Sequence, residues 1–173
     1  MKQPSRILLA ILPLLLLAGG CGGGANQASA AASSQSASDT LRLQGRVTDA
    51  ANILAADVER RLSARLQRLE EATGHQMVVV TTPSLGGEDI ATYTRALGNR
   101  RGVGRKDYDD GIIVLIAPQE RKTRIAVGYG LEKVLTDAAC AEVIRDDMIP
   151  HFRKGNFASG VEAAVASLSA KLS

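Results

Sequence analysis

The sequence of 173 residues has few cysteines and little excess charge. Cys21 and Cys140 are its two cysteines, too few for a disulfide framework. The net charge is +3, and without Lys2 and Arg6 the sequence contains 19 basic and 18 acidic residues. So small an excess gives no support for nucleic-acid binding. The length suits one ordinary domain with a sizeable core and argues against a two-domain enzyme.

No apolar run in the sequence is long enough to cross a bilayer, which takes about 20 residues. The longest covers residues 7–18 and follows Lys2 and Arg6. A short apolar run behind basic residues is typical of a secretory signal. Small residues then lead directly to Cys21, in a pattern that resembles a bacterial lipoprotein signal. We therefore expect residues 1–20 to be removed and Cys21 to carry lipid; the alternative is a plain secretory signal.

Residues 21–44 contain Cys21 and a stretch dominated by glycine, alanine, serine and glutamine. Such a composition cannot bury a core and predicts a flexible tether. A coil of this kind reaches about 25 Å, by the scaling of about 5–6 Å times the square root of residue number. We expect an extracytoplasmic domain held near a membrane by Cys21. In a Gram-negative cell, an aspartate directly after the lipidated cysteine would be a signal for retention in the inner membrane. The residue here is Gly22, which favours the outer membrane facing the periplasm.

The periodicity of residues 45–173 predicts alternating helices and strands. Apolar residues recur at helical spacing over residues 55–72, and the sequence predicts further helices over residues 88–99, 136–148 and about 161–172. The apolar runs 76–82 and 112–117 predict buried strands, and the alternating segment 122–128 predicts a strand nearer the sheet edge. Pro150 is expected to end the helix that starts near residue 136. The order implies a single three-layer α/β/α domain with a small mixed sheet. Whether residues 46–48 add a strand stays open.

This topology brings two acidic loops to one end of the sheet. A parallel crossover between strands 76–82 and 112–117, followed by an antiparallel hairpin, places the loop before residue 112 beside the loop after residue 128. Carboxylates are ligands that Ca²⁺ prefers. The sequence therefore predicts a site for Ca²⁺ or another divalent cation, built from Asp109, Asp110, Glu132 and Asp137. The alternatives are a turn at Asp110 and a helix-start acid at Asp137.

Other candidate groups have ordinary structural explanations. Arg105 and Lys106 follow a Gly-Val-Gly sequence and are candidates for phosphate binding, although the sequence favours a flexible solvated loop here. Cys140 lies on an apolar helix face and is expected in the core. His75 lies at the acidic end, as a second acid/base group or a plain loop residue. No Ser-His-Asp set, zinc-ligand spacing or dinucleotide-binding fingerprint occurs.

Six short motifs, in order, resemble those of the TPM domain family. They are GRVTDA at 45–50, TGHQMVVV at 73–80, GVG at 102–104, DG at 110–111, VGYGLE at 127–132 and LTD at 135–137. The family includes thylakoid acid-phosphatase-like proteins and bacterial envelope proteins of the YgcG type. The resemblance implies a TPM domain over residues 45–173. It also implies acid phosphatase activity in some members, calcium binding in others, and roles in the maintenance of membrane proteins.

The sequence leaves two functions open, and a third interpretation is a purely structural spacer, for which neutralising the acidic loops would change nothing. The first is a lipid-anchored module of the cell envelope that binds another envelope protein, with Ca²⁺ ordering the acidic loops. The alternative is a metal-assisted phosphomonoesterase, in which the acids would hold the ion and Arg105 or Lys106 would bind phosphate. The sequence leaves open whether the domain is an enzyme.

Overall fold

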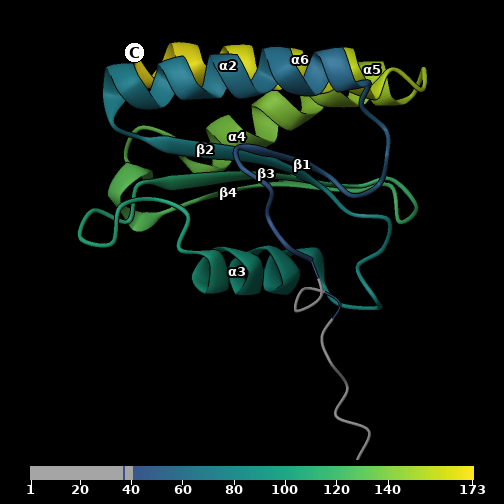
Figure 1. Ribbon diagram of the computed structural model, residues 1–173, viewed down its shortest axis with the longest axis horizontal. Coiled ribbons are helices and arrows are strands. Elements are labelled where there is room, and N and C mark those ends of the chain that lie inside the picture. The colour runs from purple at the N-terminus through teal and green to yellow at the C-terminus, as the bar shows by residue number, and fades with distance from the viewer. Residues whose placement is uncertain (1–36, 38–40) are drawn as a thin grey trace, which may run out of the picture. The chain divides into compact units, whose positions relative to one another are not determined.

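The computed structural model describes residue 37 and residues 41–173. Ser34–Ser173 form one compact unit. The predicted signal peptide, Cys21 and most of the tether lie outside the described residues. The elements follow one another (Figure 1) as β1 (Val47–Asp49), α2 (Ala56–Thr73), β2 (Gln76–Thr81), α3 (Ile90–Arg101), β3 (Gly111–Ala117), β4 (Lys122–Val127), the 3-10 turn η1 (Tyr129–Leu131), α4 (Asp137–Val143), the π-helical turn η2 (Ile144–Met148), α5 (Ile149–Phe152) and α6 (Phe157–Leu172).

The four strands form one mixed sheet in the order β1-β2-β3-β4. β1, β2 and β3 are parallel, and β4 pairs antiparallel with β3. In this register Val79 lies opposite Val47 on one side and Val114 on the other. The parallel crossover and the hairpin are therefore confirmed. The strand that the sequence left open exists as β1, at the sheet edge.

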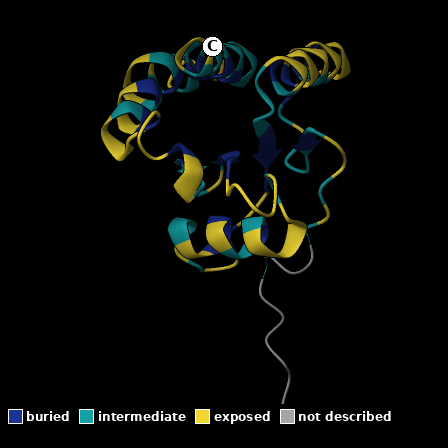
Figure 2. Ribbon diagram, turned by 90° about the vertical axis from the view of Figure 1, so that its left-hand side faces the viewer, coloured by how far each residue is buried: buried dark blue, intermediate teal, exposed yellow. Residues whose placement is uncertain are grey.

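Helices cover both faces of the sheet, which confirms the three-layer α/β/α fold. In Figure 1, α3 lies on one face, and α2, α4 and α6 lie on the other. Successive residues of the fully buried strands point to opposite faces. Met77 and Val79 accordingly join the core under α2 and α6, while Val78 and Val80 join the core against α3. Figure 2 shows the buried strands between helices whose outer surfaces are exposed.

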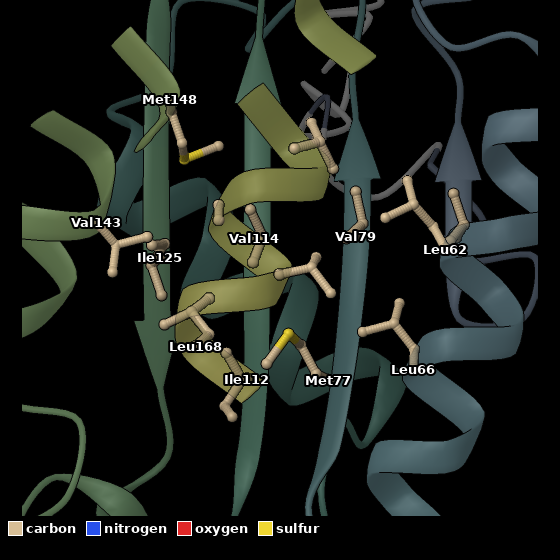
Figure 3. Close-up of a cluster of buried hydrophobic side chains, with 14 of the residues drawn as sticks. Leu62, Leu66, Met77, Val79, Ile112, Val114, Ile125, Val143, Met148 and Leu168 are labelled. Carbon is tan, nitrogen blue, oxygen red and sulfur yellow. The ribbon is translucent and has the colours of Figure 1, made fainter. Parts of the chain in front are cut away.

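The larger core lies between the sheet and the helices α2, α4, η2 and α6. Leu62 and Leu66 of α2 and Leu168 of α6 are fully buried there against the strands (Figure 3). The helix α2 ends at Gly74, which adopts a left-handed conformation with φ of 77° and donates its N–H to the carbonyl of Glu70. Cys140 is buried in the same core, as predicted, and burial raises the pKa of its thiol.

Pro150 does not end the helix as expected. The chain continues from α4 through the π turn of η2 into α5, where Pro150 lies in the first turn. A proline in a first turn needs no N–H partner, and its fixed φ suits a helix start. The π turn re-registers the backbone, so that Ile149 donates its N–H to the carbonyl of Ile144.

The two ends of the sheet carry different structures. The loops before β2 and β3 and the loop after β4 meet at one end, which we call the loop end: residues 74–75, 102–110 and 128–136. The turn between β3 and β4 lies at the opposite end, which we call the hairpin end. Asp49 lies there too, at the close of β1, and its carboxylate accepts N–H groups of Ile53 and Leu54. Among the described residues, no helix is long and apolar enough to cross a membrane.

Candidate functional site

The two loops expected to converge are joined through their backbones. Gly128 donates its N–H to the carbonyl oxygen of Gly111 at 2.8 Å, and Gly130 donates to the carbonyl oxygen of Asp109 at 3.1 Å. Both contacts extend the antiparallel pairing of β3 and β4 past the strand ends. The loop before β3 and the loop after β4 therefore form one surface at the loop end.

Glycine is required where these loops touch. A Cβ atom at Gly128 would lie 1.9 Å from the carbonyl oxygen of Asp109. A Cβ atom at Gly130 would lie 2.0 Å from the carbonyl oxygen of Tyr108. No side chain fits at such distances, so the Gly-Tyr-Gly sequence is needed for loop-to-loop packing.

Asp110 is the buried centre of the loop end. Its Oδ1 accepts the backbone N–H of Arg105 at 2.7 Å, and its Oδ2 accepts Nε–H of the same arginine at 2.7 Å. The Nδ1 atom of His75 lies 3.2 Å from Oδ2. The side chain of Asp110 is only 3% exposed, against 24% for His75 and 48% for Arg105. One buried carboxylate thus fixes a histidine and an arginine that both reach the surface.

The charge on Asp110 is maintained by these partners. Burial by itself raises the pKa of this carboxyl, but the hydrogen bonds from Arg105, assisted by His75, hold it below its ordinary value. The same ion pair raises the pKa of Arg105. The guanidinium of Arg105 also stacks over the ring of Tyr108, 4.1 Å from its centroid. Asp110 therefore positions Tyr108 through Arg105.

The other predicted metal ligands are exposed and separately arranged. Asp109 has a left-handed backbone with φ of 46°, and Glu132 and Asp137 are exposed. Asp137 lies in the first turn of α4, where a negative charge is favourable. Both oxygens of Asp110 already accept hydrogen bonds. Within residues 41–173, no three histidine, cysteine, aspartate or glutamate side chains form a group that fits a metal ion. The four acids as arranged do not fit Ca²⁺, and the metal site stays a prediction.

The Gly-Val-Gly loop has little free backbone to offer a phosphate. Gly102 donates its N–H to Gly98, Gly104 donates to the Oε1 atom of Gln76, and Arg105 donates to Asp110. The side chain of Arg105 is also occupied by Asp110. Lys106 is exposed and forms no ion pair with another residue of the described part of the chain. Phosphate binding here stays a prediction, for which Lys106 is the freest cation.

The loop end also exposes large apolar side chains. Three are exposed among the described residues: Tyr108 at 60%, Tyr129 at 82% and Val134 at 51%. All three lie in the loops that meet at the loop end. The Gly-Tyr-Gly sequence indicates that Tyr129 could pack or contact a partner, whereas no pattern marks Tyr108 or Val134. His75 lies at this end, as the sequence indicated, but its contact with Asp110 has no local signal in the sequence.

Residues 47–171 match the sequence profile described as the TPM domain. The N-terminal domain of a P. gingivalis protein, solved in solution, is 34% identical, with a TM-score of 0.70 over 74% of this chain and 82% of that chain. That structure is of a domain solved apart from the rest of its protein, and the compact unit Ser34–Ser173 of this chain is the corresponding fragment for experiments. Among curated proteins, none matches this sequence significantly.

Two further solved structures share the fold at lower identity. The N-terminal domain of the cg2496 protein from Corynebacterium glutamicum is 21% identical, with a TM-score of 0.60 over 76% of this chain and 82% of that chain. The BA42 protein from the psychrophilic bacterium Bizionia argentinensis is 20% identical, with a TM-score of 0.56 over 69% and 81%. The profile match covers most of the chain and agrees with the ordered motifs of the sequence, so this chain belongs to the TPM domain family.

Proposed function

We propose that this TPM domain is a protein-binding module of the cell envelope, anchored by lipid on Cys21, and that the loop end is its binding surface. One observation supports this most strongly. Tyr108 and Tyr129 are exposed on two loops whose backbones are locked together. Tyrosine is enriched among the residues that dominate protein–protein binding energy.

The local structure lowers the entropic cost of binding through these tyrosines. Exposed aromatic groups on mobile loops lose freedom when a partner binds, which weakens the complex. Here Gly130 fixes one loop against the other, and Arg105 holds the ring of Tyr108 from one side. A partner therefore meets a surface that is already arranged. The exposed acids Asp107 and Asp109 flank Tyr108 in the chain, in keeping with the polar rim of a protein interface.

The cellular setting follows from the amino-terminal sequence. The basic and apolar pattern before Cys21 supports export and lipidation, and the tether supports a domain close to the membrane surface. The partner is then another protein of the envelope, exposed on the same side of the membrane. In a Gram-negative cell, that is the periplasmic side of the outer membrane.

The proposal is tested by co-purification from detergent-solubilised envelopes of cells that make the tagged full chain. We expect Y108S and Y129S together to reduce the recovered partner by at least about tenfold, since interface tyrosines contribute on the order of 2 kcal/mol each. The matched control is R65S, an exposed change on α2 away from the loop end. Equal recovery with the double variant and with R65S would rule out the loop end as the binding surface.

Calcium dependence is a separate part of the proposal. The four predicted acids do not fit the ion as arranged, so we derive no binding step from it. Calcium addition in the co-purification is nevertheless informative, with the D109N/D137N variant beside the unchanged chain. Recovery that rises with Ca²⁺ only in the unchanged chain would support the calcium prediction, and recovery insensitive to Ca²⁺ would remove it.

A phosphomonoesterase is the second candidate, and the pair of His75 and Asp110 favours it. A histidine hydrogen-bonded through one ring nitrogen to a buried carboxylate is a common arrangement for proton transfer. Lys106 would bind phosphate nearby. The test is hydrolysis of p-nitrophenyl phosphate by residues 34–173 with chelator, Ca²⁺, Mg²⁺ or Zn²⁺, beside D110N and H75Q purified identically. Turnover that both variants abolish supports an enzyme, and equal turnover in all three proteins indicates a contaminant.

A further inference from the structure

A cavity of about 930 Å³ lies at the hairpin end, opposite the loop end. Its lining comes from the end of β3, the start of β4, the first residues of α3, and the segment from η2 to α6. In open α/β sheets, ligands bind characteristically outside the carboxyl ends of the parallel strands. This cavity lies outside the carboxyl end of β3, which is parallel to β2. Its volume is that of a small-molecule site.

The floor of the cavity is apolar. Half-buried side chains line it from both helical layers: Ile90, Ile144, Ile149, Phe152 and Phe157. The rings of Phe152 and Phe157 lie 5.1 Å apart with a 44° tilt, an arrangement that aromatic pairs favour. Such an apolar lining suits a hydrocarbon group.

The rim of the cavity is basic. Three exposed cations line this rim: Arg121, Lys122 and Arg153. None of them lies within salt-bridge distance of an acidic side chain in the described part of the chain. The backbone N–H of Thr92 holds the pKa of Asp89 below its ordinary value, and that of Leu85 does the same for Glu120; the charge of Lys122 contributes less to both. The lone acidic residue in the lining is Asp89, whose carboxylate caps α3 by accepting the N–H groups of Ala91 and Thr92. Three cations thus border an apolar floor whose single acid is already engaged.

The π turn forms one wall of this cavity. Ile144 begins η2 and Ile149 follows it, and both side chains line the cavity. A π turn is an uncommon and costly backbone feature that occurs frequently at ligand sites. In this chain the π turn joins α4 to α5, and the side chains of Ile144 and Ile149 both line the cavity.

We propose that the hairpin-end cavity binds one long-chain fatty acid, with the hydrocarbon on the apolar floor and the carboxylate at Arg121, Lys122 and Arg153. The charge of the rim favours an anionic head group, and the apolar floor together with the volume of about 930 Å³ favours one hydrocarbon chain. This site is independent of the protein-binding surface at the loop end. A membrane surface would instead need its cations spread across a plane.

The test is a titration of ¹⁵N-labelled residues 34–173 with monomeric myristate, followed by NMR. We expect saturable shifts of the amide signals of Thr123, Ile149 and Phe157, with Gly104 and Tyr129 unchanged. Tetradecanol, with the same chain and no charge, should bind at least about tenfold more weakly, since hydrogen bonds to a charged group contribute that much. Absent shifts, or shifts scattered over the whole domain, would overturn the proposal.

Charge variants locate the head group. The K122E/R153E variant should weaken myristate binding by at least about tenfold, because both cations would be replaced by acids. The matched control is K154E, which changes an exposed lysine beside Arg153 that does not line the cavity. Unchanged loop-end signals verify the fold of each variant. Equal weakening by K154E would overturn the site, as would binding to vesicles containing anionic phospholipid without any binding of monomeric myristate.

Discussion

At the scale of single residues, Asp110 decides how the loop end is arranged. It is buried, and its partners Arg105 and His75 come from different loops. We expect D110N to lower the free energy of unfolding at pH 7 by about 1.5–3 kcal/mol, because hydrogen bonds from charged donors to a charged acceptor are lost. Urea denaturation of residues 34–173 measures this. An unchanged midpoint would show that the cluster contributes nothing to stability.

The lowered pKa of Asp110 also determines how the free energy of unfolding depends on pH. The folded-state pKa of Asp110 lies below its ordinary value of 3.8, so the unfolded chain binds this proton more readily. The stabilisation is fully present above about pH 5 and is lost as the pH falls through the folded pKa. The stability difference between the unchanged chain and D110N should therefore shrink below about pH 4. If the difference in free energy of unfolding between the unchanged chain and D110N stays constant down to pH 3, the lowered pKa of Asp110 is not the cause of the stabilisation.

Gly130 and Tyr129 are neighbours with separable roles. G130A inserts a Cβ atom 2.0 Å from the carbonyl oxygen of Tyr108, so the loops must move apart. We expect a loss of about 1–3 kcal/mol in stability, typical of overpacking, together with reduced partner binding. Y129A removes an exposed side chain and should reduce binding with stability within about 0.5 kcal/mol. Thermal unfolding and co-purification measured on both variants distinguish the two roles, and identical profiles would refute the separation.

Sequence reasoning placed Asp110, Arg105 and His75 at the same end of the sheet but did not show that they contact one another. The acid precedes a strongly apolar strand, and the topology alone placed it at the loop end. His75 lies 35 positions earlier in the chain and has no local pattern that marks it. The contacts of Gly128 and Gly130 are between backbones, so no side-chain periodicity records them.

At the scale of elements, hydrophobic patterning was sufficient for the long segments. The apolar runs of β2 and β3 and the helical spacing of α2 survive in the structure because their burial is the main driving force of the fold. β1 has three residues, too few to show a period. Pro150 lies in the first turn of α5, a position that proline tolerates, so the presence of a proline alone did not show where the helical segment ends.

The helix α2 offers a direct measure of this packing. Leu66 is fully buried against the sheet, and L66A should lower the free energy of unfolding by about 2–5 kcal/mol through lost burial and a residual cavity. R65A, its exposed neighbour, should change stability by no more than about 0.5 kcal/mol. Chemical denaturation of both variants gives the comparison. A small effect at Leu66 would mean that α2 is not seated on the sheet.

At the scale of the whole molecule, the sheet presents two unlike ends. The loop end carries exposed tyrosines on locked loops, and the hairpin end carries an apolar cavity with a basic rim. The sequence indicated the first end through its acids and gave no sign of the second. That cavity is formed by residues from four separate segments, which meet only after the helices pack on the sheet.

The proposed membrane anchor also belongs to the scale of the whole chain. C21S should release the protein from the membrane fraction, because the acyl chains that contribute about 0.8 kcal/mol per buried methylene group would be absent. Cell fractionation and incorporation of labelled palmitate measure the effect. A C21S protein that still sediments with membranes, or an unchanged chain that takes up no palmitate, would contradict lipidation at this residue.

The binding role of the loop end is tested most directly by photo-crosslinking in living cells of the source organism. A photoreactive phenylalanine replaces Tyr129 in one version of the full chain and Gln119, exposed at the hairpin end, in another. The account predicts a discrete protein adduct from position 129 that disappears when Y108S is added, and no such adduct from position 119. No adduct from position 129, or the same adduct from both positions, would contradict it.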